Sequence, residues 1–312
     1  MSTQKYSLGS WGVLESEVDF PELGKAKEDP TFHFRIDDSS GLSHIAGREI
    51  QSWELPDGQE WLRIHDAVSN YFFTFSGYAG YEVSKDFRDA VCCPQQPVQR
   101  ETLRHLFLDQ VLPLMMAAKG ETVLHGSAVA IEGRAIVFLG TSGAGKSTIA
   151  VKLGSLGYPL LTDDCLLLRF SADEVLACAS YPGARLFEPM IELMFERNAA
   201  TSAVAEYTSK RRIDLVRTKL KLQGEAVPLG ALFVVTEGQR DVAWRPFDGS
   251  QRLVELAKYR YRFDPTDKGA LRKEFPTLVR LAQYPCYEFR YRRSPESLQQ
   301  IETSVLTALK NA

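Results

Sequence analysis

The first hundred residues contain short segments in which apolar and polar residues alternate. Residues 32–36, 61–64 and 71–75 show this pattern, with turn residues such as Ser76-Gly77 between segments. Alternation with a period of two, bounded by turn residues, is typical of β-hairpins. We therefore predict a β-rich N-terminal domain over residues 1–97, built on an antiparallel sheet.

A helix is expected next. Between residues 99 and 118, apolar residues recur three or four positions apart, as on one face of a helix. Pro113 should bend or interrupt this helix. We expect residues 98–120 to form a connecting helix between the N-terminal domain and a second domain at residues 121–312.

The second half alternates strands with helices, which predicts the α/β class. Two apolar strands, at residues 123–131 and 135–139, are joined by a short turn containing Gly133, as in a hairpin. Later strands are expected at residues 159–162, 166–170, 175–179, 229–235 and 286–291, and helices at about 188–197, 250–261, 267–283 and 295–310. The polar stretch at residues 198–209 has poor periodicity and is expected to be a mobile loop.

Composition narrows the class of protein. Apolar residues make up 44% and charged residues 25%, as in ordinary globular proteins, and the net charge of −3 argues against a nucleic-acid binder. No apolar run approaches the roughly 20 residues of a membrane span. The five cysteines are an odd number, which argues against a disulfide framework. We expect a cytoplasmic protein that binds neither membrane nor nucleic acid. The oligomeric state stays open, and a homo-oligomer is one alternative.

The strand at residues 135–139 runs into a glycine-rich sequence of the form Gly-x-x-x-x-Gly-Lys-Ser, and a helical pattern follows. In this spacing the backbone N–H groups face phosphate oxygens, the lysine reaches the β- and γ-phosphates, and the hydroxyl ligates Mg²⁺. We predict that ATP or another nucleoside triphosphate binds here with Mg²⁺, and that Ser147 is a metal ligand. The predicted binding residues are Gly140, Thr141, Ser142, Gly143, Ala144, Gly145, Lys146, Ser147 and Thr148.

Two acidic residues, Asp163 and Asp164, end the next strand. We expect that strand to lie beside the strand at residues 135–139, which would bring both carboxylates to the γ-phosphate. Phosphoryl transfer needs a carboxylate for the metal and a group that takes the proton of the nucleophile. A solvated acidic turn is the alternative. His125 is either an active-site group or a buried structural histidine.

Three motifs in this order resemble the catalytic domain of HPr kinase/phosphorylase. They are Leu124-His125-Gly126-Ser127, the glycine-rich loop, and Gly157-Tyr-Pro-Leu-Leu-Thr-Asp163-Asp164. The resemblance covers about residues 123–170. A weaker likeness to HPr-kinase-like serine kinases, including those that modify lasso-peptide precursors, extends over nearly the whole chain. The match over residues 123–170 implies a P-loop catalytic domain whose fold elements recur in phosphoenolpyruvate carboxykinase.

Carried over by position, the resemblance implies that Asp163 accepts the substrate hydroxyl proton, that Asp164 binds the metal and that His125 is the active-site histidine. The two aspartates could exchange these roles. The family signature Glu-Ile-Arg-Gly-Leu-Gly is absent, and Tyr181-Pro-Gly-Ala-Arg185-Leu-Phe187 stands in its place. Arg185 is the candidate cation of this segment.

A basic segment supplies the last candidates. Lys210 and Arg211 follow the polar stretch, and its closure over the triphosphate would stabilise transition-state charge as arginine fingers do. A solvated basic turn is the alternative, and residues 290–293 are expected to be amphipathic surface.

Together these residues predict a Mg²⁺-dependent kinase acting on a serine hydroxyl of a protein or peptide, including a lasso precursor peptide. A kinase for a small metabolite or free amino acid is an alternative, and a nucleotide-sensing module without catalysis is another.

Overall fold

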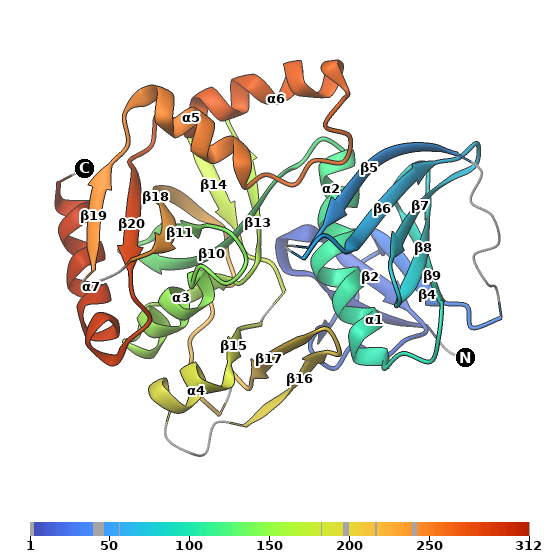
Figure 1. Cartoon of the computed structure of the whole chain (residues 1–312), viewed down its shortest axis with the longest axis horizontal. Coiled ribbons are helices and arrows are strands. Elements are labelled where there is room, and N and C mark those ends of the chain that lie inside the picture. Colours follow the sequence, from blue (N-terminus) through green and yellow to red (C-terminus); the bar gives the residue numbers. More distant parts are fainter. Residues whose placement is uncertain are drawn as a thin grey trace. The chain divides into compact units, whose positions relative to one another are not determined.

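The computed structural model describes residues 3–39, 47–55, 57–181, 183–195, 200–215, 217–238 and 242–311. Pro182 and residues 198–199, which belong to candidate segments, lie outside these ranges. The chain divides into two compact units (Figure 1). The first contains Met1–Glu121, Ala205–Thr208 and Arg262–Leu271, and the second contains the remainder. Two short segments of the C-terminal half therefore fold with the N-terminal half. The domain limits at residues 97 and 121 stay a prediction.

Within its described residues, the first unit carries a nine-stranded sheet in the order β3-β1-β2-β4-β9-β8-β7-β6-β5. The strands are β1 (Gln4–Ser7), β2 (Val13–Ser16), β3 (Gly24–Lys25), β4 (Phe32–Ile36), β5 (Arg48–Glu54), β6 (Glu60–Asp66), β7 (Asn70–Phe75), β8 (Ala79–Ser84) and β9 (Asp89–Pro94). The prediction of an antiparallel sheet is wrong for the two pairings of β4. The antiparallel run from β5 to β9 returns the chain beside β4, and β4 is parallel to both β2 and β9.

The helical segment of the first unit is interrupted, as Pro113 predicts. A π-helical turn, η2 (Phe107–Val111), separates α1 (Arg100–Leu106) from α2 (Leu112–Ala118). Pro113 lies in the first turn of α2, where the proline nitrogen has no hydrogen to continue the regular pattern. The segment packs on the sheet: the Phe107 and Phe34 rings stack with centroids 4.4 Å apart, and the Tyr81 hydroxyl donates to the Leu103 carbonyl at 2.7 Å.

The main strands of the second unit close into a ring through the pairings β11–β10, β10–β13, β13–β14, β14–β18 and β18–β11. Their bounds are β10 (Thr122–Ile131), β11 (Arg134–Leu139), β13 (Cys165–Phe170), β14 (Val175–Cys178) and β18 (Val227–Glu237). The strand β20 (Cys286–Tyr291) adds parallel to β18, and β19 (Ala243–Pro246) pairs antiparallel with β20. The predicted hairpin of β10 and β11 is present, and the mixed sheet with helices confirms the α/β class.

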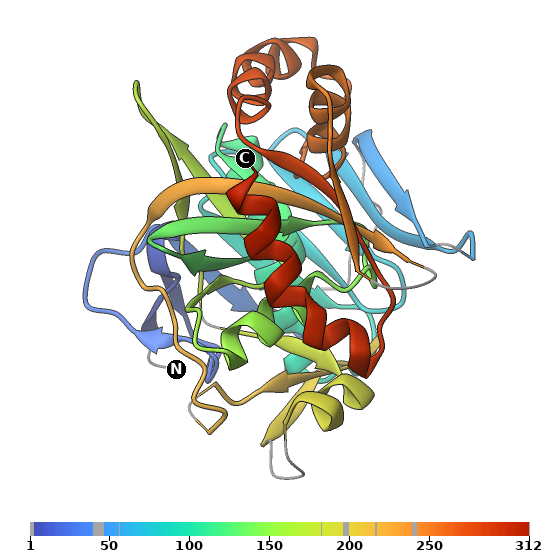
Figure 2. The same ribbon diagram turned by 90° about the vertical axis from the view of Figure 1, so that its left-hand side faces the viewer.

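Helices cover both faces of this sheet. One face packs against α3 (Lys146–Ser155) and α7 (Pro295–Lys310) (Figure 2), and the other against α5 (Gly249–Lys258) and α6 (Lys268–Leu281). Side chains alternate along β11, so that Ile136 and Phe138 enter the first core while Val137 and Leu139 enter the second. Burial on both faces fixes the strand that leads into the glycine-rich loop.

The strand β12 (Leu160–Thr162) does not lie beside β11, and that prediction is wrong. It pairs with β10 through Thr162–Ala128 and Leu160–Val129. The two edges of β11 are already occupied by β10 and β18. As a result, β10 brings residues 125–127 close to the acidic pair that follows β12.

The prediction of an irregular segment at residues 198–209 is wrong for its described part. β16 (Thr201–Ala205) and β17 (Thr208–Ile213) form a three-stranded sheet with β15 (Arg185–Phe187), which leads into α4 (Glu188–Met194). The residues of β16 are small and polar, so the sequence shows no apolar alternation there. The segment is ordered instead because β17 pairs with the distant strand β15, with Arg212 opposite Arg185 and Lys210 opposite Phe187.

The tip of this hairpin, Ala205–Thr208, belongs to the first unit. There the Tyr207 ring packs edge-on against Trp61, with centroids 4.8 Å apart, and stacks on His105 at 5.7 Å. The Glu206 N–H donates to the Thr102 hydroxyl oxygen at 2.9 Å. An aromatic residue and a backbone hydrogen bond therefore fix the tip within the first unit.

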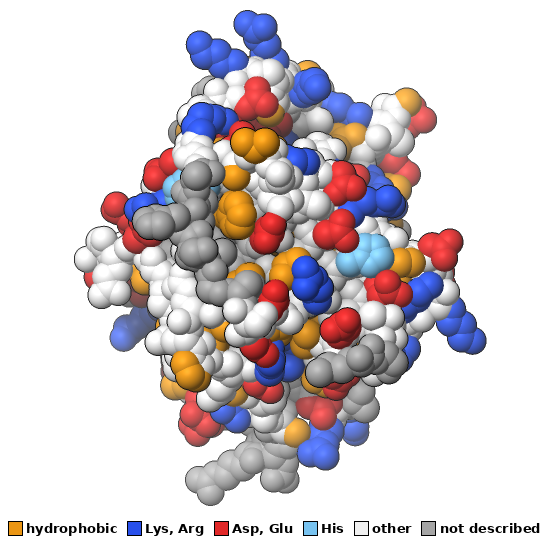
Figure 3. All heavy atoms as spheres, turned by 90° about the vertical axis from the view of Figure 1, so that its right-hand side faces the viewer, with side chains coloured by type: hydrophobic (Ala, Val, Ile, Leu, Met, Phe, Trp, Pro, Cys, Tyr) orange, Lys and Arg blue, Asp and Glu red, His pale blue; other side chains and the backbone are white. Residues whose placement is uncertain are grey.

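Across the described parts of the chain, no helix has both the length and the apolar character needed to cross a membrane. On the face that Figure 3 shows, acidic and basic side chains are interspersed. That mixture matches the near balance of 37 basic and 40 acidic residues in the sequence.

Candidate functional site

The glycine-rich loop joins β11 to α3, and its glycines are required by their surroundings. Gly140 and Gly145 have φ of 155° and 103°. A Cβ at Gly140 would lie 2.7 Å from the Val235 carbonyl oxygen, and one at Gly145 would lie 1.9 Å from the Tyr291 hydroxyl oxygen. Side chains there would collide with β18 and β20. Residues 141–145 are exposed or half-buried, so their backbone is open to a ligand.

Lys146 begins α3, and its ammonium group lies within the loop. Its Nζ donates to the carbonyl oxygens of Gly140 at 2.9 Å and Thr141 at 3.0 Å. Burial lowers the pKa of Lys146, while the negative charge of Asp164 opposes that change. The ammonium therefore lies where this motif positions the β- and γ-phosphates.

Asp163 and Asp164 form the turn between β12 and β13. The Thr162 hydroxyl donates to the Cys165 carbonyl at 2.6 Å, and the Gly126 N–H donates to the Asp164 carbonyl at 2.9 Å. Asp164 has a φ of 75°, in the left-handed region that Asp and Asn adopt more readily than most residues. The turn lets two successive carboxylates face the same neighbour, Arg185.

The carboxylate of Asp163 is enclosed. Its Oδ1 accepts a hydrogen bond from the Ser127 hydroxyl at 2.7 Å, and its Oδ2 accepts one from the Arg185 backbone N–H at 3.0 Å. The Arg185 guanidinium donates to the Asp163 carbonyl at 3.2 Å and pairs with the Asp164 carboxylate at 3.1 Å. Arg185 therefore cross-links the acidic pair, and both side-chain oxygens of Asp163 have partners.

Asp164 is the more accessible of the two acids. Its side chain is 15% exposed, against 1% for Asp163. Burial and the negative charge of Asp164 raise the pKa of the Asp163 carboxyl, and together they outweigh Arg185. The charge of Asp164 also acts on His125 and Lys146, so it lies near both.

His125 lies on β10 beside this turn. Its backbone N–H donates to the Tyr259 carbonyl at 2.7 Å, and its ring is edge-on to Tyr261 with centroids 6.2 Å apart. Burial, reinforced by the positive charge of Lys146, lowers the pKa of His125 to about 4. The imidazole is therefore neutral at physiological pH.

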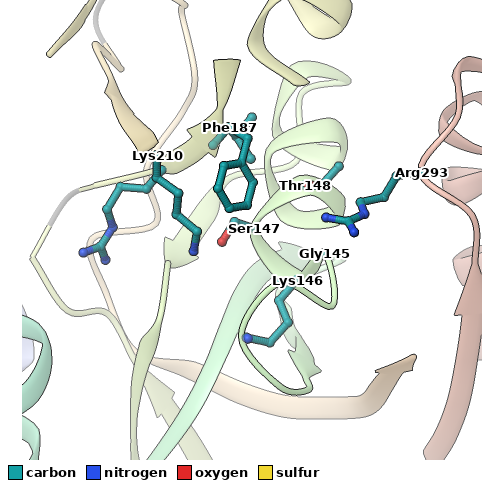
Figure 4. A pocket seen from close by; sticks show the side chains of 10 residues that line it. Gly145, Lys146, Ser147, Thr148, Phe187, Lys210 and Arg293 are labelled. Atoms are coloured by element: carbon teal, nitrogen blue, oxygen red, sulfur yellow. The ribbon is translucent and has the colours of Figure 1, made fainter. Parts of the chain in front are cut away.

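A pocket opens over the loop and the first turn of α3 (Figure 4). Besides Gly143, Gly145, Lys146, Ser147 and Thr148, its lining includes Arg185, Leu186, Phe187, Lys210 and Arg293. The Lys210 ammonium lies 5.8 Å from the centre of the Phe187 ring. Lys210 and Arg293 stand on opposite sides of Ser147 and Thr148 in Figure 4. The pocket is thus flanked by a cation at each end.

Of the two basic candidates on β17, Lys210 lines the pocket and Arg211 does not. The Arg211 Nε donates to the Thr201 hydroxyl oxygen at 3.2 Å, and its Nη2 donates to the Thr201 carbonyl at 3.5 Å. Successive side chains on a strand point to opposite faces. The strand geometry therefore separates these two residues, which the sequence treated as a pair.

Three residues of this region were not identified from the sequence. Ser127 has no catalytic motif of its own, although it follows His125 by two residues. Phe187 is a plain apolar residue of β15. Arg293 was assigned to an amphipathic surface, yet it lines the pocket. Arg293 follows β20 by two residues, and the parallel pairing of β20 with β18, which the sequence does not reveal, brings it to an edge of the sheet where ligands commonly bind.

The residues present fit a magnesium ion that is shared with phosphate. In the parts of the chain that the structure describes, no group of three or more His, Cys, Asp and Glu side chains is arranged to hold a metal. Mg²⁺ in phosphate sites commonly takes one or two carboxylates and obtains its other ligands from phosphate and water. Asp164 is partly exposed and Ser147 lines the pocket, which matches that smaller donor set.

The chain is similar to curated proteins named HPr kinase/phosphorylase. It is 32% identical over 116 residues to one from a Geobacillus species and 31% identical over 99 residues to one from Lachnoclostridium phytofermentans. The first match covers 36% of each chain, and the second covers 31% of this chain and 32% of the relative. The chain therefore matches about a third of the length of these relatives. No family model matches it.

A search of solved structures finds the Hpr(Ser) kinase/phosphatase from Coxiella burnetii, with a TM-score of 0.33 and 12% identity, covering 61% of this chain and 97% of that chain. The sequence relatives carry the same family name as the resemblance found in the three motifs. Their similarity confirms the resemblance to HPr kinase/phosphorylase that the three motifs indicate.

Proposed function

We propose that this chain is a Mg²⁺-dependent kinase that transfers the γ-phosphate of ATP to a serine hydroxyl of a protein or peptide. The observation that carries the proposal is the grouping of a phosphate-binding loop with Asp163, Asp164 and Arg185 at one end of the same sheet. A loop alone supports binding. A partly exposed carboxylate near the lysine of the loop adds the means for proton transfer.

In this proposal the loop N–H groups cradle the α- and β-phosphates, Lys146 reaches the β- and γ-phosphates, and Thr148 lines the same pocket. Ser147 and Asp164 are the protein groups that would hold Mg²⁺, which neutralises charge developing on the phosphates when it is bound. Lys146 reaches the phosphates by exchanging its bonds to the Gly140 and Thr141 carbonyls for bonds to phosphate oxygens.

We assign proton transfer, as well as metal binding, to Asp164, which departs from the division of roles that the resemblance implies. Asp163 is enclosed, and its two oxygens already accept from Ser127 and Arg185. Asp164 accepts the serine proton as the serine oxygen attacks the γ-phosphorus, and the bond from that phosphorus to ADP breaks. Asp163 and Arg185 act as positioning residues, because they hold Asp164 in its turn.

Lys210 and His125 complete the proposed site. The Lys210 ammonium neutralises charge on the transferred phosphoryl group, which is the role of such cations in phosphoryl transfer. Neutral His125 lies near Asp164 and serves as a hydrogen-bonding group without adding charge. The proposed site thus holds its cations at the phosphates and the partly exposed carboxylate of Asp164, which pairs with Arg185, at the nucleophile.

The acceptor class rests on the relatives, whose name links them to HPr. We therefore take a serine on a protein or peptide, including a lasso precursor peptide, as the first acceptor class. A small metabolite or free amino acid is the second candidate acceptor. A nucleotide-sensing module is the candidate without catalysis.

The test incubates the purified chain with Mg²⁺ and ATP labelled at the γ-phosphate. Candidate acceptors are HPr, serine-containing peptides, free serine and small metabolites, and the Lys146→Ala chain is the control. Label on a protein or peptide, lost when its serine is replaced by alanine, supports the proposal. Label on a metabolite supports the second candidate, binding without turnover supports the sensor, and phosphate release without any acceptor indicates a plain nucleotide hydrolase.

A further inference from the structure

Arg293 is a cation at the pocket to which the proposed mechanism gives no role. It follows β20 by two residues and lines the same pocket as Gly145 and Thr148 (Figure 4). Arg290, in contrast, pairs with Glu288 at 2.7 Å. Arg293 forms no ion pair with any residue that the structure describes. Its guanidinium therefore faces a phosphate-binding loop without a carboxylate of the protein to neutralise it.

The segment that carries Arg293 is held at both ends. On one side Tyr291 is buried, and its hydroxyl donates to the Gly145 carbonyl at 3.0 Å. On the other side Ser294 caps α7, since its Oγ accepts from the Ser297 N–H at 3.3 Å. The backbone at Arg293 therefore has a fixed position relative to the glycine-rich loop. Its side chain reaches one end of the pocket.

The geometry of the loop distinguishes the γ-phosphate end of the pocket from the nucleoside end. In this motif the loop backbone cradles the α- and β-phosphates, Lys146 reaches the β- and γ-phosphates, and the Ser147 hydroxyl is the group for Mg²⁺. Lys210 lies on the Ser147 side of the pocket, and Arg293 lies on the side of Gly145 and Thr148 (Figure 4). Arg293 stands across Ser147 and Thr148 from Lys210 (Figure 4). The nucleoside of a bound nucleotide therefore leaves the loop on the Arg293 side.

We propose that Arg293 forms a nucleoside subsite, in which its guanidinium plane stacks on the nucleobase of the bound nucleotide. This inference rests on the proposed function, because it needs a nucleotide on the loop. A guanidinium is planar and weakly hydrated, and it stacks readily on aromatic faces. Every nucleobase has such a face, so stacking does not distinguish one base from another. The subsite favours nucleotides over inorganic polyphosphates without choosing between ATP and GTP.

Calorimetric binding of ATP, GTP and inorganic tripolyphosphate to the full chain, each with Mg²⁺, tests the subsite. Arg293→Ala should weaken ATP and GTP about tenfold each, as expected for one base stacked on one side chain, and leave tripolyphosphate unchanged. Arg293→Lys keeps the charge without the plane and should show most of the same loss for ATP. The matched control is Arg292→Ala, an exposed neighbour outside the pocket lining, which should bind all three ligands normally.

Two results would overturn the subsite. Equal weakening of ATP and tripolyphosphate by Arg293→Ala would assign the guanidinium to the phosphates. ATP binding unchanged by both Arg293 variants would make it a surface residue. If the unsubstituted chain binds none of the three ligands, the proposed function fails first and the subsite fails with it. The two kinds of failure are therefore distinguishable by the unsubstituted chain alone.

Discussion

Separate replacement of Asp163 and Asp164 by asparagine tests the division of roles within the acidic pair. Asp163→Asn keeps the size of the side chain but leaves a single acceptor oxygen for two donors, the Ser127 hydroxyl and the Arg185 N–H. The amide nitrogen must then face one of those donors. Asp164→Asn changes a 15% exposed side chain at a φ of 75°, which asparagine tolerates as well as aspartate does.

These contacts imply that the two substitutions change the free energy of unfolding and the rate of phosphoryl transfer by different amounts. A buried hydrogen bond to a charged group contributes about 1.5–3 kcal/mol, and buried Arg185 also loses part of its countercharge. We expect Asp163→Asn to lower the free energy of unfolding by about 3 kcal/mol, which corresponds to a Tm lower by about 6–12 °C for a domain of this size. Asp164→Asn should cost about 1 kcal/mol. It should slow phosphoryl transfer by about 10²–10⁴-fold, the usual contribution of a general base.

Thermal unfolding, calorimetric binding of ATP with Mg²⁺ and transfer of labelled phosphate measure the three consequences. Ser127→Ala is the matched control for Asp163, because it removes one donor without changing any charge. It should lower the Tm by less than Asp163→Asn and retain transfer. The assignment is refuted if Asp163→Asn keeps the Tm and loses transfer while Asp164→Asn only raises the Mg²⁺ requirement. The roles implied by the sequence would then be correct.

Four further substitutions probe the same site. Lys146→Ala should slow turnover by on the order of 10² or more, and unchanged turnover would exclude the phosphate-loop mechanism. Lys210→Ala should lower kcat far more than it lowers ATP affinity, because the charge of Lys210 acts mainly in the transition state. Arg211→Ala should leave kcat nearly unchanged, because Arg211 is bonded to Thr201 and does not line the pocket. Equal effects of the two substitutions on kcat would contradict the strand geometry. The pKa of His125 is about 4 in the folded chain and 6.5 for an unperturbed histidine, so the unfolded state binds the proton more readily. Stability should fall as pH drops from about 6.5 toward 4, and His125→Gln should reduce that part of the Tm profile.

Local chemistry accounts for the features that were predictable from the sequence. The hairpin of β10 and β11 turns at Glu132 and Gly133, whose φ values of 51° and 74° fit the tight turn expected there. The interruption before α2 follows from Pro113, which lacks an N–H. The glycine-rich loop was identifiable because its spacing encodes a backbone shape. Each feature depends on residues a few positions apart, so a single sequence suffices to find it.

Non-local pairing explains what the sequence could not predict. β10 takes β11 along one edge and both β12 and β13 along the other. Nothing within the three residues of β12 specifies which edge of which apolar strand it joins. The same limit applies to Arg293, whose place at the pocket follows from the parallel pairing of β20 with β18. In both cases the deciding partner is distant in the sequence.

The basic segment shows how such pairing changes a functional interpretation. Lys210 lies opposite Phe187 of β15 and lines the pocket, whereas Tyr207, three residues earlier, packs with Trp61 and His105 in the first unit. An extended strand cannot shift along its own axis without moving the residues on either side. The pairing of β17 with β15 therefore restricts where the Lys210 ammonium can lie, even though β15 is distant in the sequence. In the proposed mechanism the charge is held in place by strand pairing before nucleotide binds, and no closure of a free loop is needed to deliver it.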